Sequence, residues 1–206
     1  MSGINRAAFD SLRRAVELYQ AGNFDEAESL CTAIVRAAEG YFDALHMLAV
    51  VQWQLGRLPE ALFNYDKAVT INPGHAEAWS NRGAALYGLK RFDDALSSYD
   101  KALAIDPDHA DAWSNRGVAL YELKCFEEAL SSYDKALAIN PDDAETLNNR
   151  GNTLQQVTRF EEALSSYDKA LAINPDHFEA LKNRGNALQQ VKRFEEPCRA
   201  MTKRWR

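Results

Sequence analysis

Apolar and small residues recur along the chain with helical spacing, and the whole pattern returns every 34 residues. In residues 76–109, Trp79, Gly83 and Leu86 share one face of a predicted helix. After a short interruption, apolar residues with helical spacing predict a second helix, which Pro107 ends. We therefore predict two antiparallel helices joined by a short turn. Because glycine inside a helix costs about 1 kcal/mol relative to alanine, Gly83 indicates a close approach between the two helices.

Copies of this unit fill most of the chain. The string SSYDKALAI occurs three times, starting at Ser97, Ser131 and Ser165. A single helix hairpin cannot bury both of its faces, so a repeat of this length predicts a stacked array of hairpins. The units are residues 8–41, 42–75, 76–109, 110–143, 144–177 and a partial unit at 178–196. We expect an all-α solenoid of about six antiparallel helix pairs, the last one incomplete.

Residues 197–206, PCRAMTKRWR, depart from the pattern. At this place the repeat requires a string close to A-L-S-S-Y-D-K-A-L-A. One possible coding string for the tail, with a single base restored in front, reads A-L-P-S-Y-D-K-A-L-A. We interpret the tail as aberrant, shifted in frame by a one-base deletion, rather than as an unrelated basic segment. Because repeat arrays need a polar cap at each end, we expect a frayed C-terminus and self-association through the uncapped C-terminal end.

The repeat unit resembles the tetratricopeptide repeat in its length and signature positions, and the resemblance covers about residues 8–196. In the unit 76–109 these positions hold Trp79, Gly83, Leu86, Phe92, Ala95, Tyr99, Ala102 and Pro107. The resemblance implies a right-handed superhelix of helix pairs, whose first helices line a concave groove that binds other proteins. The repeats are also similar to the tetratricopeptide arm of O-linked N-acetylglucosamine transferases.

One position departs from the family pattern, because an arginine precedes the glycine of four units. These arginines are Arg82, Arg116, Arg150 and Arg184, and sixteen residues before them stand Asp66, Asp100, Asp134 and Asp168. In the second unit the arginine position holds Leu48, and sixteen residues earlier stands Thr32, so charge occurs at both places or at neither. We predict that each Asp on a second helix pairs with the Arg of the next unit's first helix. The alternative is that the arginine stems lie along the surface with their heads in water.

The first helices carry a polar face opposite their packing face. Its predicted groove residues are Asn81, Asn115, Asn149, Asn183, Tyr87, Tyr121, Asn152, Asn186, Gln155 and Gln189. Ser80, Ser114 and Asn148 share this face of the helical wheel. The first four asparagines form a column that looks like the asparagine ladder of the transferases. An amide both donates and accepts, which suits the backbone of an extended peptide. Alternatively, these asparagines bond within the array.

The outer edge of the polar face is acidic. Successive units place Glu77, Asp111, Glu145 and Glu179 there, and Lys182 is the one cation on the predicted face. Family members that clamp the C-terminal carboxylate of a partner place Lys or Arg on this surface. An acidic peptide terminus would be repelled here, so we expect a different binding mode.

Composition excludes several classes of function. The formal net charge of −6 argues against a general affinity for nucleic-acid phosphates. Three irregularly spaced cysteines form neither a disulfide framework nor a zinc signature. The N-terminus has no apolar secretion signal, and the longest apolar run, residues 44–51, is too short to span a bilayer. We therefore expect a cytoplasmic protein that does not bind nucleic acid or membranes.

No residue pattern indicates catalysis, a cofactor or a metal site. His75, His109 and His177 occur once per unit in equivalent turns, which is not the spacing of metal ligands. We predict a non-enzymatic scaffold that binds a peptide segment of a partner protein in the groove. One alternative is a truncated substrate-binding arm of a larger glycosyltransferase resembling the O-linked N-acetylglucosamine transferases. Another is a decayed gene product without a selected role.

Overall fold

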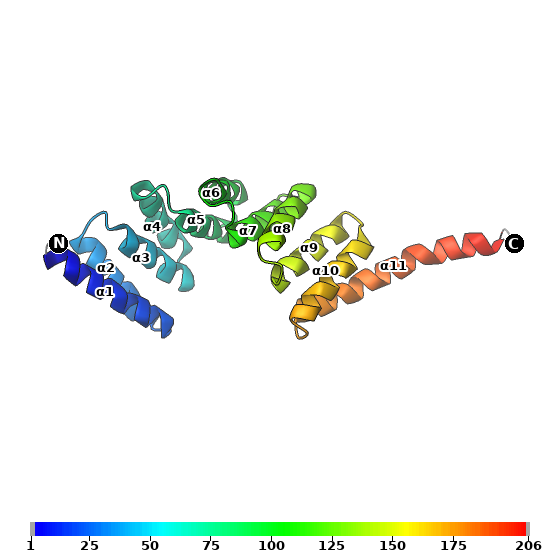
Figure 1. The fold of residues 1–206 in the computed structure, drawn as a ribbon, viewed down its shortest axis with the longest axis horizontal. Coiled ribbons are helices and arrows are strands. Elements are labelled where there is room, and N and C mark those ends of the chain that lie inside the picture. The colour runs from blue at the N-terminus through cyan, green and yellow to red at the C-terminus, as the bar shows by residue number, and fades with distance from the viewer. Residues whose placement is uncertain (1–2, 205–206) are drawn as a thin grey trace. The chain divides into compact units, whose positions relative to one another are not determined.

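The computed structural model describes the backbone of residues 3–204 and the side chains of residues 6–192. Every regular element in that part of the chain is an α-helix, which confirms the predicted all-α fold. The helices are α1 (Gly3–Gln20), α2 (Phe24–Ala37), α3 (Phe42–Gln54), α4 (Leu58–Ile71), α5 (Ala76–Gly88), α6 (Phe92–Ile105), α7 (Ala110–Glu122), α8 (Phe126–Ile139), α9 (Ala144–Gln156), α10 (Phe160–Ile173) and α11 (Phe178–Arg204). The chain divides into two compact units, Met1–Pro107 with α1 to α6 and Asp108–Arg206 with α7 to α11 (Figure 1).

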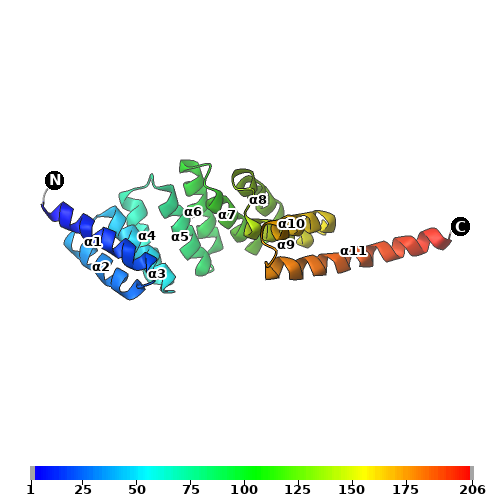
Figure 2. The same ribbon diagram turned by 60° about the horizontal axis from the view of Figure 1, so that its bottom comes forward.

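Within each unit, successive helices pack as pairs joined by short turns (Figures 1 and 2). The first unit pairs α1 with α2, α3 with α4 and α5 with α6, and the second pairs α7 with α8 and α9 with α10. A second helix also packs against the first helix of the next pair, as α4 does against α5 and α8 against α9. Such a second helix is covered on two sides, as expected for stacked hairpins.

The turn inside every pair has the same backbone geometry. Its key residue has a positive φ, near 60° at Lys90 and 75° at Gly56, and ends the first helix in the left-handed region. At this turn the backbone N–H of Lys90 donates to Tyr87, and the N–H of Arg91 donates to Leu86. These two bonds satisfy carbonyls that the end of the helix leaves open. The equivalent residues are Gly22, Gly56, Lys90, Lys124 and Thr158.

The glycine of the first helix is required by a tyrosine of the second helix in the same pair. A β-carbon placed on Gly83 would lie 2.6 Å from Cε1 of Tyr99, and one on Gly117 would lie 2.5 Å from the same atom of Tyr133. No real β-carbon tolerates such a distance, so the ring lies directly against the backbone of the first helix. The predicted close approach of the two helices is confirmed.

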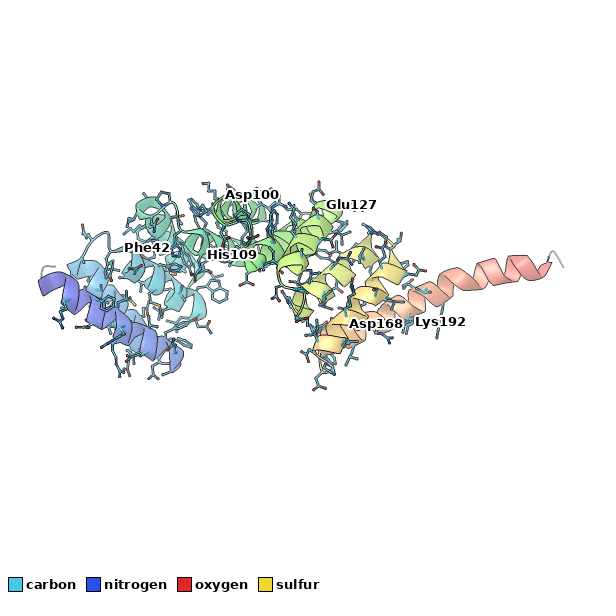
Figure 3. The ribbon with its side chains drawn as sticks, in the orientation of Figure 1. Phe42, Asp100, His109, Glu127, Asp168 and Lys192 are labelled. Atoms are coloured by element: carbon cyan, nitrogen blue, oxygen red, sulfur yellow. The ribbon has the colours of Figure 1, made fainter. Side chains whose placement is uncertain are left out.

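The predicted Asp–Arg pairs form between consecutive repeats. Arg82 Nε donates to Asp66 Oδ1 at 2.6 Å, and Arg150 Nε donates to Asp134 Oδ1 at 2.7 Å. The third pair that lies within one unit joins Arg184 to Asp168 with the same geometry at 2.5 Å. Figure 3 labels Asp168 on α10. The alternative of free arginine heads is therefore wrong at these three positions.

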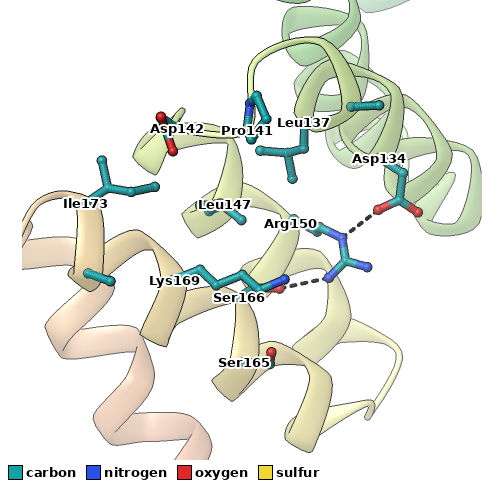
Figure 4. A pocket seen from close by; sticks show the side chains of 12 residues that line it. Asp134, Leu137, Pro141, Asp142, Leu147, Arg150, Ser165, Ser166, Lys169 and Ile173 are labelled. Carbon is teal, nitrogen blue, oxygen red and sulfur yellow. Dashed lines mark hydrogen bonds and ion pairs between the residues drawn. The ribbon is translucent and has the colours of Figure 1, made fainter.

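Each paired arginine of a complete repeat also contacts a serine that the sequence analysis did not anticipate. Arg150 Nη1 donates to Ser166 Oγ at 2.8 Å while its Nε binds Asp134 (Figure 4). Arg82 donates to Ser98 Oγ at 2.6 Å in the same way. One guanidinium thus joins the second helix of the preceding repeat to the second helix of its own repeat. We call this arrangement the Asp–Arg–Ser bridge.

The second repeat replaces the bridge with an apolar contact. Leu48 stands where the later repeats have arginine, and it is 5% exposed in a cluster with Ala15 and Cys31. The polar contact to the second helix of the repeat is made one helical turn later. There Gln52 accepts a hydrogen bond from buried Asn64 at 2.8 Å. The second repeat therefore packs its two helices as the later repeats do, but with an apolar contact in place of the Asp–Arg–Ser bridge.

Within residues 3–204, the last helix is not followed by a second helix of its own. α11 packs against α10 and α9 and then continues as a single helix to Arg204, extending beyond that pair in both views (Figures 1 and 2). The chain is helical where the earlier repeats turn, at the position equivalent to Thr158. The frame-shift interpretation concerns residues 197–206, whose side chains lie outside the described range, and self-association through the C-terminal end stays a prediction. Within residues 3–204, no helix is both long and apolar enough to cross a membrane.

Candidate peptide-binding face

All ten predicted groove residues lie on first helices, and all are at least partly exposed. Asn81 and Tyr87 belong to α5; α7 carries Asn115 and Tyr121; α9 carries Asn149, Asn152 and Gln155; α11 carries Asn183, Asn186 and Gln189. Two neighbours on the helical wheel behave differently, because Ser80 and Asn148 are only 4% and 3% exposed. Their expected place on the open face is therefore wrong, and they belong to contacts between helices.

Two members of the asparagine column bond to the preceding first helix. The amide nitrogen of Asn81 lies 3.1 Å from Nε2 of His46 on α3. The amide nitrogen of Asn183 donates to Asn148 Oδ1 on α9 at 3.1 Å. In both cases the partner stands 35 residues earlier and has a polar side chain longer than serine. For Asn81 and Asn183, the alternative of bonding within the array is the one that holds.

The two middle members of the column have free amides. Within the described residues, the side chains of Asn115 and Asn149 have no hydrogen-bond partner, and both are half-buried. The residue 35 positions before Asn149 is Ser114, whose hydroxyl is engaged with Thr146 at 2.6 Å. Thr146 is fully buried and is also held by Asp143, the N-cap of α9. Ser114 is thus occupied, which leaves the amide of Asn149 for an external partner.

Asn152 and Gln155 are oriented by one buried phenol. Tyr167 on α10 donates its O–H to Asn152 Oδ1 at 2.8 Å, and the amide of Gln155 donates to the same hydroxyl oxygen. Burial raises the pKa of Tyr167 to about 12, so the hydroxyl keeps its proton at neutral pH. Tyr167 therefore fixes the orientation of both amides, and Asn152 Nδ2 and Gln155 Oε1 remain available for hydrogen bonds to a ligand.

The tyrosines of the face rest on the phenylalanines that begin the second helices. The ring centroids of Tyr121 and Phe126 are 5.6 Å apart in an edge-on arrangement. Tyr87 and Phe92 are 5.4 Å apart. Lys124 places its ammonium group 5.5 Å from the centroid of Tyr121. Each tyrosine is thus a half-buried aromatic surface next to the asparagine column.

The acidic edge of the face has little counter-charge in the second unit. Glu145 is 69% exposed, with His177 Nε2 at 3.3 Å from its carboxylate. Lys182 is paired with Glu179. The only cation that the sequence analysis found on the face is therefore already neutralised. A carboxylate terminus has no free positive partner among these residues.

Comparison with known families assigns the repeats. Models described as tetratricopeptide repeat match residues 82–144 and 144–177, and a model described as TPR repeat matches residues 51–90. Together they span more than half of the chain. The chain belongs to the tetratricopeptide repeat family. Proteins of this family generally act as scaffolds for protein interactions, and none of the matching models describes an enzyme.

Solved tetratricopeptide structures share the fold of this chain. TTC0263, a thermophilic TPR protein of Thermus thermophilus, is 26% identical with a TM-score of 0.70, covering 88% of this chain and 99% of that one. PilF of Pseudomonas aeruginosa is 20% identical with a TM-score of 0.76, covering 94% of each chain. YrrB is 21% identical with a TM-score of 0.72, covering 89% of this chain and 98% of that one. No curated protein matches the sequence. The expected similarity to the glycosyltransferase arm is not shown by these comparisons.

The three equivalent histidines cap tetratricopeptide helices. His75, His109 and His177 each accept the backbone N–H three residues later through Nδ1, from Ala78, Ala112 and Ala180. They were predicted as turn residues, and the structure gives that position a specific role as a helix N-cap. Among the described side chains, no three His, Cys, Asp or Glu residues gather where they could hold a metal ion.

The second helices border two hollows that the sequence analysis missed. One in the second unit, of about 580 Å³, lies between α8 and α10 and is lined by Arg150 and Lys169 (Figure 4). An equivalent one in the first unit, of about 720 Å³, is lined by Leu45, Phe63 and Ile71. The signal in the sequence was Phe63, which is 59% exposed at a position where the later repeats have serine. In the hollow of the second unit Asp134 already pairs with Arg150, and the lining also includes the charged side chains of Lys169 and Asp142.

Proposed function

We propose that this tetratricopeptide protein binds an extended peptide segment of a partner protein on the first-helix face of its second unit. Asn115 and Asn149 contact the peptide backbone, and Tyr121 covers a side chain of the peptide. The observation that carries the proposal is the pair of half-buried amides without a partner, one on each of two neighbouring first helices. The proposed site extends to Asn152 and Gln155 on α9 and to Asn183, Asn186 and Gln189 on α11.

The chemistry of the face favours the backbone of the peptide over a charged terminus. A primary amide can donate to a backbone carbonyl and accept from a backbone N–H at the same time. Asn152 and Gln155 offer further amide groups whose orientation Tyr167 fixes, so less side-chain entropy is lost on binding. The acidic edge at Glu145 disfavours an acidic peptide and favours a neutral or basic one.

The role of Asn81 differs from the role that the sequence analysis gave it. Because its amide nitrogen is engaged with His46, Asn81 contributes to the first unit's internal packing and has one N–H and its carbonyl oxygen left for a ligand. Asn183 is limited in the same way by Asn148. The binding energy is therefore concentrated at Asn115 and Asn149. YrrB, a tetratricopeptide protein with an unusual peptide-binding site, offers a precedent for peptide binding on this fold.

The test is an affinity measurement with matched asparagine variants. A partner is selected on the wild-type chain, and its binding segment is synthesised as a peptide. The double variant Asn115→Ala with Asn149→Ala should lower the affinity for the peptide by roughly tenfold or more, since each lost hydrogen bond is worth about 1 kcal/mol. Asn140→Ala removes an exposed asparagine at the end of α8, away from the face, and should leave the affinity unchanged. Equal affinities for wild type and the double variant would refute the site.

A further inference from the structure

The packing face of α11 is open where the same face of α9 is covered. Leu147 on α9 is 5% exposed, and its equivalent on α11, Leu181, is 50% exposed. Gly151 is buried, whereas Gly185 is exposed and a β-carbon on it would meet nothing within 4 Å. We call Leu181, Gly185 and the half-buried Leu188 the open face of α11. The equivalent positions on α5, α7 and α9 are covered by the second helix of the same repeat. The contacts that fit the open face of α11 can therefore be inferred from those three helices.

The copies show what chemistry fits the glycine. In all three complete later repeats, the covering helix places a tyrosine ring against the equivalent glycine. The pairs are Gly83 with Tyr99, Gly117 with Tyr133 and Gly151 with Tyr167. Each tyrosine is at most 1% exposed. The open face therefore has the shape that receives a tyrosine from an amphipathic helix.

The arginine that precedes the glycine also differs between α11 and the earlier first helices. Arg82, Arg116 and Arg150 each donate Nη1 to a serine of the covering helix, one position before its tyrosine. Arg184 keeps the other half of the bridge, with Nε at 2.5 Å from Asp168. Within residues 6–192 it has no serine, and its side chain is 40% exposed against 23% for Arg150. Arg184 is thus held in place by Asp168, and within the described residues its Nη groups have no serine partner.

We propose that the open face of α11 binds, in trans, an amphipathic helix of another protein that carries a serine–tyrosine pair followed by small residues. The tyrosine lies over Gly185, and the serine hydroxyl accepts from Arg184. This surface is separate from the first-helix face described above and does not depend on the function proposed for it.

A second copy of the chain is a poor occupant. Its helices with this pattern, α6, α8 and α10, already place their tyrosines against glycines of their own repeats. Exposing one of them would require a repeat to unfold. The α11 segment of a second copy cannot replace them, because the sequence has no tyrosine after Tyr167.

The probe is a capped peptide with the sequence of residues 160–173, FEEALSSYDKALAI, titrated into the full-length protein by fluorescence anisotropy. We expect saturable binding, and a weakening of about tenfold or more when the tyrosine of the peptide is replaced by alanine. Gly185→Ala should weaken the binding of the unchanged peptide to a similar extent, because its methyl group occupies the space of the ring. Alanine is the better helix former, so this variant remains folded.

Three results would overturn the proposal. The first is an absence of binding at peptide concentrations of about 1 mM, where a weak helix–groove contact would still be seen. The second is equal binding to wild type and Gly185→Ala, which would place the peptide elsewhere on the array. The third is a dimer of the wild-type chain, detected by sedimentation and abolished by Gly185→Ala, which would make a second copy the occupant.

Discussion

Gly151 on α9 lies so close to Tyr167 on α10 that an added β-carbon would be 2.5 Å from the ring. The same glycine one repeat later, Gly185, faces open space. One sequence position therefore has two different environments, because only one of its copies has a covering helix.

This contrast predicts opposite effects for the same substitution. Gly151→Ala should lower the free energy of unfolding by about 1–3 kcal/mol, since the methyl group overpacks against a fully buried ring. Gly185→Ala should instead raise the local stability of α11 by up to about 1 kcal/mol through helix propensity. Urea denaturation and amide hydrogen exchange measure the two effects. A loss of similar size in both variants would contradict the assigned environments.

The Asp–Arg–Ser bridge should couple consecutive repeats. In a double-mutant cycle, Asp134→Asn and Arg150→Gln should show a coupling of about 0.5–1 kcal/mol, modest because the aspartate side chain is 58% exposed. The coupling should decrease with added salt. Asp168→Asn, combined with the same arginine variant, is the matched control, because Asp168 pairs with Arg184. Additive effects in the first cycle would mean that the pair does not join the repeats energetically.

The hairpin turns store strain wherever the left-handed residue has a β-carbon. Thr158 has a φ of 60°, and a β-branched side chain is especially unfavourable there. Thr158→Gly should raise the free energy of unfolding by about 1 kcal/mol. Gly56→Ala, at the equivalent turn, should lower it by a similar amount. Thermal denaturation provides the measurement, and a destabilised Thr158→Gly would show that the side chain has a role beyond the turn.

The pH dependence of the first unit should follow His46. Its ring lies among Phe42, Tyr65 and His75, at centroid distances of 5.7, 5.9 and 5.4 Å. Burial lowers the pKa of His46 and His75 lowers it further, while Glu77 and Asp43 oppose the shift. Its neutral Nε2 is the atom that the Asn81 amide contacts.

The sign follows from proton binding. Between the lowered pKa of folded His46 and the ordinary value of about 6.5, the unfolded chain binds more protons than the folded one. The free energy of unfolding should therefore be fully retained above a pH of about 6.5 and decrease as the pH falls below it. His46→Gln keeps an acceptor for Asn81 and should flatten this decrease in urea titrations between about pH 5 and 7.5. An unchanged profile in the variant would assign the pH dependence to another group.

The fold was largely predictable from the sequence because each repeat restates the same rules. Gly83 predicted a close helix pair, and the Asp66 and Arg82 positions predicted a contact between repeats from their joint presence and absence. Periodicity alone did not reveal that Lys90 would adopt a positive φ, since this turn position holds glycine in the first two pairs but Lys or Thr in the next three. It also did not show that α11 would remain a single helix.

The site was predictable only as a set of positions. Helical spacing placed the asparagines on one face, but which amides remain free depends on neighbours in another helix. Asn183 is engaged because Asn148 reaches it, and Asn149 is free because Ser114 is bound to Thr146. These outcomes depend on side-chain length and on competition for hydrogen bonds between helices. A helical wheel drawn for one helix carries no information about either.

The most direct test of the account is a nuclear magnetic resonance titration of the side-chain amides with the binding peptide of a selected partner. The account predicts that the Nδ2 resonances of Asn115 and Asn149 shift in proportion to saturation, while that of Asn140 stays in place. If the peptide saturates the protein and leaves both Asn115 and Asn149 unchanged, the free amides of the first-helix face are not its binding site.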